Sequence, residues 1–230
     1  KMNLIIFNIL SLTLLTFISS CNNSRLSDEE IENKAIVITK KLNEENIDIF
    51  RKWNFGSRGE AEIWTKTVKG STLYGCIYLK STHTTNITIF NSFVYSQDFP
   101  LKIELDTSKY QKFEFKKSPD QKIKVVGIDQ NGHDIVIKSN LSENEVFINK
   151  SPFEKLDSLN ILKDELGVCG ISHIGRIGDF VQFYITRQDI LTFISDYSTF
   201  NPMYKDIWIK TFSKGKEIKE NWNLRRLDKS

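Results

Sequence analysis

The segment 61–68, AEIWTKTV, and the segment 72–80, TLYGCIYLK, decide the fold of this chain. Both are rich in β-branched and aromatic residues, the composition typical of strands. Only three residues separate them, which is the length of a hairpin connection and too short for a crossover helix. The pair therefore predicts neighbouring antiparallel strands.

The strand pattern continues towards residue 150. The further segments that show it are 86–95, 101–105, 113–115, 122–128, 135–138 and 145–149. Between two of them, Asn131-Gly132 supplies the positive φ values that a tight hairpin turn needs. Successive short strands with hairpin-length connections predict an antiparallel meander rather than βαβ units.

Two helices are predicted on either side of these strands. Ser27 and Glu30 form a capping box, and apolar residues follow at helical spacing up to Leu42, with an extension as far as Trp53 or a break at 43–46. The second helix begins with Ser151 as N-cap and Pro at the first helical position, with Glu154 completing the box. Four leucines give its buried face, and glycine 167 ends it.

The remaining segments are shorter. The pattern predicts a glycine-rich loop over 167–178, a strand over 179–186, a short helix over 187–196 and a strand over 206–212, while the period of 217–227 is ambiguous. Together these elements predict an α+β fold: an antiparallel β-sheet of about seven to nine strands with two or three packed helices.

Charge and size exclude some classes of protein. The chain has 32 Lys and Arg against 29 Asp and Glu, a net charge of +3, and the two signs are interspersed. This balance argues against nucleic-acid binding. Residues 27–230 are ample for one domain with a sizeable core.

The N-terminus carries the most specific signal in the chain. Residues 4–18 are largely apolar and are followed by Ser19, Ser20 and Cys21, after which hydrophobicity drops at once. An apolar run of this length fits the h-region of an export signal and is too short for an ordinary membrane span. The alternatives are a plain cleaved signal or an uncleaved anchor.

The segment Ile18-Ser19-Ser20-Cys21 resembles the lipobox of bacterial lipoproteins. The resemblance covers residues 1–21 and implies cleavage after residue 20 and acylation of Cys21, so that the protein's first partner is the lipid bilayer. It divides the chain into a signal peptide (1–20), a lipidated tether (21–26) and a single α+β domain (27–230). It also implies a cell-envelope location. Asn22 rather than Asp after the cysteine favours the outer over the inner membrane in a Gram-negative host.

Cys76 and Cys169 remain once Cys21 is assigned to lipid. An exported protein folds in an oxidising compartment, so the pair is a candidate disulfide. The alternative is two separately buried thiols, since a free cysteine behaves as a small hydrophobe.

Four tryptophans are candidates for an aromatic platform. Trp64 and Trp208 lie in predicted strands, where an inward-facing position is the default. Trp53 and Trp222 stand near polar residues and are predicted to form a ligand surface.

No residue pattern predicts a catalytic centre, metal site or cofactor. His83, His133 and His173 have no partners at ligand spacing, and the segment 129–134 lacks the spacing of a calcium loop. Cys169 and His173 stand four residues apart, but a disulfide beside a solvated histidine explains them better than a nucleophile and its base.

The sequence therefore favours a membrane-anchored envelope lipoprotein, acting as a non-catalytic binding or adaptor module for a protein or glycan. One alternative is an envelope hydrolase whose site is assembled from distant residues, since catalytic triads are recognised by geometry rather than by sequence order. Another is a periplasmic inhibitor or immunity-type protein.

Overall fold

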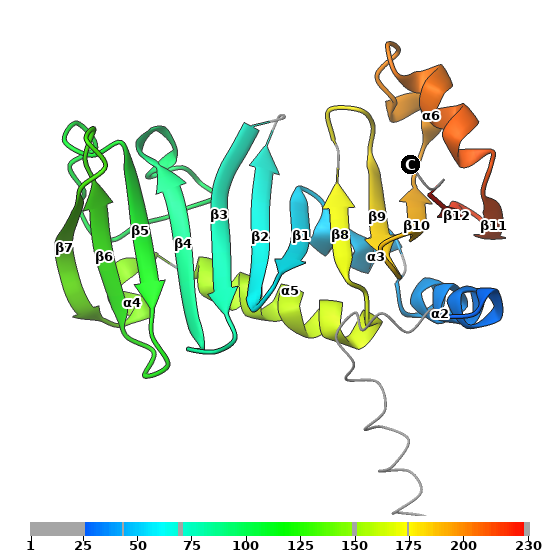
Figure 1. The fold of residues 1–230 in the computed structure, drawn as a ribbon. Helices are drawn as coiled ribbons and strands as arrows, with labels where there is room; N and C mark the ends of the chain where they lie inside the picture. Colours follow the sequence, from blue (N-terminus) through cyan, green and yellow to red (C-terminus); the bar gives the residue numbers. More distant parts are fainter. Residues whose placement is uncertain (1–25, 43, 69–70, 149–150, 174, 228–230) are drawn as a thin grey trace, which may run out of the picture.

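The computed structural model describes residues 26–42, 44–68, 71–148, 151–173 and 175–227. The predicted signal peptide (1–20), Cys21 and the tether up to residue 25 lie outside these residues. The described part is an α+β structure built on one large antiparallel sheet (Figure 1).

Twelve strands make up this sheet within the described residues, more than the seven to nine predicted. Their order is β11-β12-β10-β9-β8-β1-β2-β3-β4-β5-β6-β7, and every pair is antiparallel. The bounds are β1 (Trp53–Arg58), β2 (Ala61–Val68), β3 (Ser71–Leu79), β4 (Thr84–Phe90), β5 (Lys112–Lys117), β6 (Ile123–Ile128), β7 (Asp134–Leu141), β8 (Gly170–His173), β9 (Phe180–Tyr184), β10 (Asp189–Ile194), β11 (Lys216–Lys219) and β12 (Trp222–Arg226).

The chain enters this sheet in the middle. Strands β1 to β7 form a meander towards one edge, in which β2 to β7 were predicted and β1 was not. The chain then returns along a helix to β8, which pairs with the free side of β1 (Figure 1). From β8 a second, shorter arm runs to the opposite edge. The centre of the sheet is therefore a junction between strands that are far apart in the sequence.

The helices are α2 (Asp28–Lys41), α3 (Glu44–Ile47), α4 (Glu143–Val146), α5 (Pro152–Leu166) and α6 (Lys205–Phe212). Single 3₁₀ turns lie at Asp48–Phe50, Asn91–Phe93 and Tyr197–Thr199. The predicted capping box of Ser27 and Glu30 is present at the start of α2. Ser151 caps α5 through the Phe153 N–H instead of forming a box with Glu154, and Gly167 ends α5 at φ 61°. No helix among the described residues has both the length and the apolar character of a membrane crossing.

One face of the sheet carries the main hydrophobic core. Register places Trp64, Cys76, Ile87, Phe115 and Val125 side by side on β2 to β6, and all five are buried. Apolar residues of α2 and α5 pack into the same cluster. The helices thus cover this face, which we call the helix side; the opposite face is the open side.

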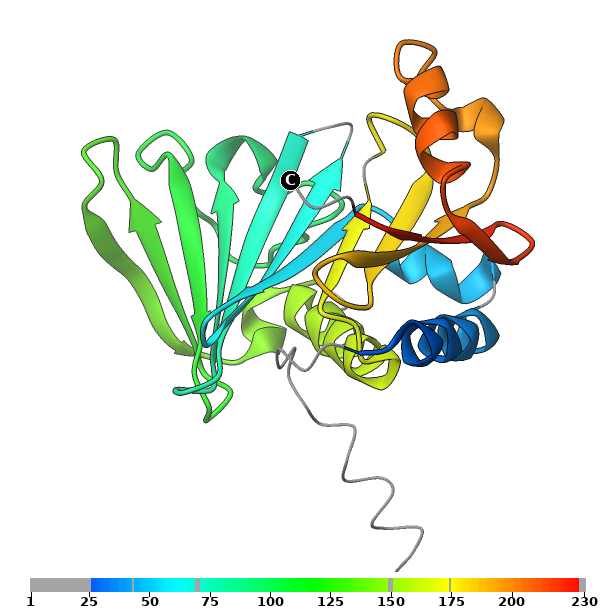
Figure 2. The same ribbon diagram turned by 45° about the vertical axis from the view of Figure 1, so that its right-hand side comes forward.

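Part of the open side is covered near the second edge. There Phe180, Ile194, Phe200 and Phe212 form a separate small core, with Trp208 of α6 packed against it. Helix α6 stands over this end of the sheet, and α2 lies below the same end (Figures 1 and 2).

Two predicted strands are absent. In two other segments the predicted type of element is wrong: a predicted helix is a strand, and a predicted strand is a helix. Segment 101–105 makes a single bridge, Leu101 to Phe147, and the predicted strand 145–149 overlaps α4 instead. Segment 187–196 contains β10 rather than a helix, because its apolar run is buried on both faces and leaves no alternation to read. Segment 206–212 is α6 rather than a strand: its β-branched residues suggest a strand, but the side chains that pack inward, Trp208 and Phe212, are four residues apart.

Candidate functional site

The predicted tryptophan surface is wrong. Trp53 and Trp222 are each only 3% exposed and belong to the main core. Trp53 packs edge-to-face on Trp64, and Trp222 packs against Phe183 and Phe193. Both begin strands that the sequence did not reveal, β1 and β12, and alternation along those strands turns them to the helix side.

The predicted disulfide is also wrong. No disulfide joins Cys76 and Cys169. Cys76 lies in β3 and Cys169 immediately precedes β8, three positions away in the sheet. Three strand spacings are about 14 Å, about twice the Cα separation that a disulfide can bridge. Burial raises the pKa of the Cys76 thiol, so this cysteine behaves as the small buried hydrophobe of the alternative interpretation.

The three histidines occupy different environments. His83 sits in a turn at φ 51° and contacts the Tyr78 hydroxyl. His133 is exposed, and the Asp129 carboxylate accepts hydrogen bonds from its backbone N–H and from that of Asn131. Of the two turn residues predicted to have positive φ, only Gly132 does. No cluster of His, Cys, Asp and Glu in the described residues has the composition of a metal site.

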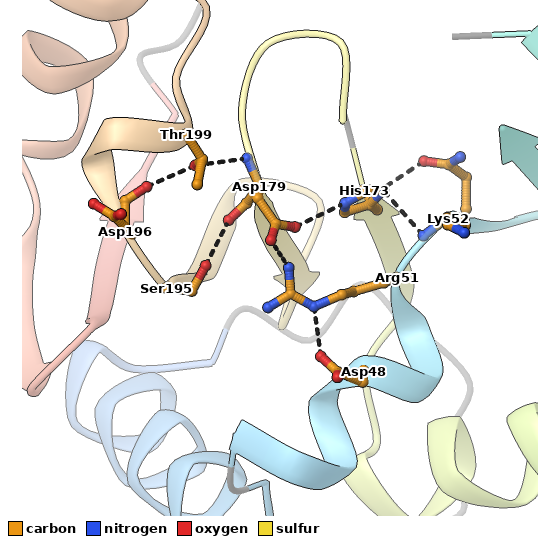
Figure 3. A network of polar contacts seen from close by, with 9 residues as sticks. Asp48, Arg51, Lys52, His173, Asp179, Ser195, Asp196 and Thr199 are labelled. Atoms are coloured by element: carbon orange, nitrogen blue, oxygen red, sulfur yellow. Dashed lines mark hydrogen bonds and ion pairs between the residues drawn. The ribbon is translucent and has the colours of Figure 1, made fainter. Parts of the chain in front are cut away.

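His173 is the histidine with most contacts, and it belongs to β8 rather than to the predicted loop. It lies where β1 and β8 separate after a single backbone pair, Phe55 with Ile171. Side chains replace the backbone ladder there: the Lys52 N–H donates to His173 Nδ1 at 3.0 Å, and the His173 N–H donates to Asn54 Oδ1 at 3.0 Å (Figure 3).

The other ring nitrogen of His173 faces an acid. Because Nδ1 accepts a hydrogen bond from the Lys52 backbone N–H, Nε2 carries the ring hydrogen and donates to Asp179 Oδ1 at 3.3 Å. The second oxygen of Asp179 pairs with the Arg51 guanidinium, which also binds Asp48 at 2.5 Å (Figure 3). Three segments of the chain therefore meet at this network.

The loop after β10 completes the network. The Asp179 N–H donates to the Thr199 hydroxyl, and the Ser195 hydroxyl donates to the Asp179 carbonyl (Figure 3). Sequence reasoning noted His173 but missed Asp179 and Arg51 as its partners. Asp179 is six residues away across a loop and Arg51 is far away in the chain, so neither spacing carries a signal.

The geometry makes His173 a neutral structural link. Burial, followed by the charges of Arg51 and Lys52, lowers the pKa of His173 to about 4. A general base needs a ring nitrogen free to take a proton from a substrate. Both nitrogens are occupied here, one by a backbone donor and the other by an acid held in an ion pair with Arg51.

A hollow lies on the open side of the sheet, next to this network. It is about 330 Å³ in volume and is lined by residues of β1 and β2: Asn54, Phe55, Gly56, Ser57, Arg58, Ile63 and Thr65. A Cβ added to Gly56, or to Gly75 on β3, would meet no atom within 4 Å. At Gly56 and Gly75, therefore, no side chain covers the backbone at the centre of the open side.

A row of mostly small or polar residues extends outward from the hollow. Register aligns Asn54, Thr65, Gly75, Thr88 and Glu114 in a row across β1 to β5, perpendicular to the strands. We call this set the polar row.

A matching set continues the pattern on the other arm of the sheet. Ser172, Gln182 and Thr192 are paired across β8, β9 and β10. Adjacent groups in such rows are one strand spacing apart, about 4.8 Å. Gln182 and Thr192 are buried, however, so on the open side only the polar row offers accessible hydrogen-bonding groups at this repeat.

Comparisons with models of protein families, with curated proteins and with solved structures found no match to this chain.

Proposed function

We propose that this protein is a lipid-anchored envelope lipoprotein whose open sheet face binds a glycan, without catalysing its conversion. The observation that carries the proposal is the hollow at Gly56 together with the polar row. An amide or hydroxyl side chain both donates and accepts hydrogen bonds, as sugar hydroxyls require. Charged groups would favour an ionic ligand, but the hollow and the row together contain only two charged residues: Arg58 in the lining of the hollow, and Glu114 at the far end of the row beside Lys116.

The shape of the open side supports an extended ligand. The hollow has the volume of a small binding pocket, but Gly56, Ser57 and Arg58 are exposed around it. A small molecule would stay largely in contact with water there. A polymer that crosses several strands would instead bury a larger area and use the groups of the row in succession.

Binding to isolated envelope glycan tests this proposal. We expect the soluble domain (27–230) to co-sediment with purified, protein-free cell-wall polysaccharide. The variant Gly56→Trp should fold normally, since nothing stands within 4 Å of its Cβ, and should lose at least about tenfold in affinity because the indole fills the hollow.

The matched control is Ser139→Trp, which places the same side chain at an exposed position of β7. It should bind like the wild type. Equal binding by Gly56→Trp and the wild type would rule out the hollow as the site.

The anchor rests on the lipobox resemblance of Ile18-Ser19-Ser20-Cys21. Cys21→Ser should abolish labelling by a radioactive fatty acid and should prevent the lipid-dependent cleavage, because serine has no thiol for the thioether bond. Labelling that persists in this variant would contradict the assignment, and with it the envelope location.

A hydrolase is the second candidate, and the pairing of His173 with Asp179 is the observation that favours it. Against it, both ring nitrogens of His173 already have partners. His173→Ala separates the two functions. A binding protein should retain its glycan affinity and show no turnover in either form, whereas a hydrolase should release reducing ends in the wild type and none in the variant.

A further inference from the structure

Two consecutive arginines of β12 have opposite surroundings. Arg226 pairs with Asp189 at 2.7 Å and with Asp28 at 2.8 Å, and these carboxylates raise the pKa of Arg226. Arg225 has no ion pair and no side-chain hydrogen bond within the described residues, and its Nε is buried without a partner. Burial therefore lowers the pKa of Arg225.

A partly buried guanidinium without an anion is an unfavourable arrangement. Taking a charge out of water costs free energy, which an opposite charge or a set of hydrogen bonds normally offsets. Arginine side chains are for this reason mostly exposed, or paired where they are buried. Arg225 is only partly exposed, and no carboxylate in the described part of the chain compensates its charge. An anion from outside the chain would fill this role.

Tyr184 stands near Arg225 on the same face of the sheet. Register pairs Ile190 with Tyr184 on one side and with Arg225 on the other, so the two residues are two strand spacings apart, about 10 Å. Tyr184 and Phe180 are four residues apart on β9, and Phe180 belongs to the small core of the open side. By the alternation of side chains along a strand, Tyr184 and Arg225 both project from the open side.

The Tyr184 hydroxyl also lacks a hydrogen-bond partner among the residues that the structure describes. Burial raises the pKa of Tyr184, and the positive charge of Arg225 opposes this increase. The hydroxyl therefore keeps its proton at neutral pH and is available as a donor. The two side chains affect each other's pKa, so the guanidinium and the phenol lie within electrostatic range.

The other charges of this region leave Arg225 uncompensated. Asp189 of β10 is already bound to Arg226. Glu217 of β11 is exposed and makes no ion pair with Arg225 in the described chain. Arg187, in the turn between β9 and β10, adds a further exposed positive charge. An anion that approaches this part of the open side therefore meets a free guanidinium.

We propose that the open side of β9, β10 and β12 binds an oxyanion, a carboxylate or a phosphate, between the Arg225 guanidinium and the Tyr184 hydroxyl. A guanidinium presents its N–H donors in a fixed fork that matches two oxygens of such a group, and the phenol adds a further donor. This oxyanion site is separate from the hollow over β1 and β2, so the proposal does not depend on glycan binding.

Titration with inorganic phosphate and with acetate tests the proposal. The full chain is kept in a non-ionic detergent, and chloride holds the ionic strength constant. Both anions should cause saturable shifts in the amide NMR signals of Tyr184, Ile190 and Arg225. Arg225→Gln should weaken binding at least about tenfold, and Tyr184→Phe about threefold, because the first loses the charged fork and the second a single neutral donor.

Lys124→Gln is the matched control, since Lys124 is an exposed lysine of β6 that has no ion pair within the described residues. It removes the same charge from the chain and should bind both anions like the wild type. Arg225→Lys keeps the charge but not the fork, and it should recover only part of the affinity. Tighter binding of phosphate than of acetate would identify a phosphate ligand, and the reverse order a carboxylate; both results support the site.

Thermal unfolding distinguishes a binding role of Arg225 from a structural one. In chloride, Arg225→Gln should unfold at the same temperature as the wild type or higher, because an unpaired charge has been removed. Arg226→Gln should unfold at a lower temperature, because Asp189 stays buried without its cation. Phosphate should raise the unfolding temperature of the wild type and leave that of Arg225→Gln unchanged.

Three outcomes would overturn the proposal. The first is a set of NMR shifts that increases without saturation, and the second is equal affinity in the wild type and Arg225→Gln. The third is an equal loss of affinity in Lys124→Gln and Arg225→Gln, which would show a response to net charge alone. Glycan binding enters none of these measurements, so this proposal and the proposed function fail separately.

Discussion

On the helix side of the sheet, Trp64, Ile87 and Phe115 are fully buried, whereas Thr65 and Thr88, their neighbours on the open side, remain partly exposed. The two sets alternate along the same strands, so each strand contributes to both faces. The helix side is filled by large apolar rings that leave little freedom for substitution. The open side has glycine at two central positions and surrounds them with small polar groups. Substitutions on the two sides should therefore differ in kind: those on the helix side should change stability, and those on the open side should change binding.

The largest expected effect is on the helix side, at Trp64. Its indole is fully buried, packs against Trp53 and Phe55, and donates to Asn160 Oδ1 on α5 at 2.7 Å. Trp64→Ala should lower the free energy of unfolding by about 3–5 kcal/mol, because a cavity remains and the Asn160 carbonyl loses its donor. Urea unfolding measures the loss. A change below about 1 kcal/mol would show that α5 does not depend on this contact.

The second effect concerns a charge on the same side. Lys163 of α5 is 4% exposed, donates to Glu62 Oε1 at 3.0 Å and lies over the Phe55 ring at 4.6 Å. Lys163→Met should cost about 1–3 kcal/mol, because Glu62 stays buried with only Lys80 as a cationic partner. Glu62→Leu in the same chain should restore part of the loss, and a double-mutant cycle measures the coupling. No coupling would mean that each charge is stabilised without the other.

The same pair should make the free energy of unfolding depend on pH in the acidic range. Burial raises the pKa of Glu62, but hydrogen bonds from Lys80 and Lys163 outweigh this effect and lower the pKa overall. A carboxyl with a lowered pKa in the folded state stabilises the fold above its unfolded pKa, and this contribution is lost as the pH falls. In Lys163→Met, the fall of stability on acidification should be shallower than in the wild type.

The third effect lies at the junction between the two arms of the sheet. His173 has a pKa of about 4 in the folded protein, below the usual value near 6.5. The unfolded chain therefore binds a proton first, and stability should fall as the pH drops from about 6.5 towards 4, by at most about 1.4 kcal/mol per pH unit. In His173→Gln, the free energy of unfolding should change less with pH over this interval. Urea unfolding curves recorded at a series of pH values measure this dependence. If the slope is the same in both proteins, His173 is not neutral in the folded state.

The smallest expected effect on stability is on the open side. Gly75→Thr should change the free energy of unfolding by less than about 1 kcal/mol, and in the stabilising direction, since a strand position with open space gains from a β-branched residue. Gly127→Thr is the contrasting control on the helix side, because its Cβ would stand 2.6 Å from the Tyr110 ring. A similar cost at both positions would remove the difference between the two sides.

The elements with strong local signals were predicted well. The capping box of Ser27 and Glu30, the start of α5 at Pro152 and its end at Gly167 all rest on neighbouring residues, and all are present in the structure. The meander from β2 to β7 follows for a similar reason, since each strand pairs with the next one along the chain, although a long connection separates β4 from β5. The predicted number of strands was too low because β1, β8, β11 and β12 lack a clear period and because β10 was predicted as a helix.

The candidate site could not be predicted from local patterns. The hollow at Gly56 exists because β1 was a strand rather than the end of a helix, and the sequence offered no period that distinguished the two. The predicted binding residues Trp53 and Trp222 turned out to be core residues once their strands were placed. A side chain's exposure depends on which face of the sheet it meets, and polar neighbours in the sequence do not determine that.

The sequence by itself determined the α+β class, the antiparallel meander from β2 to β7, the start of α2, both ends of α5 and the balance of charge. Most of these depend on residues within a few positions of one another. The tertiary structure alone decided that β8 pairs with β1, that Cys76 and Cys169 lie too far apart for a disulfide, and that His173 meets Asp179 and Arg51. These features depend on segments that are far apart in the sequence, or on a loop whose path no local preference fixes. Helix α5 packs against the sheet and leads the chain back to β8, and this packing brings the two arms of the sheet together and makes these contacts possible.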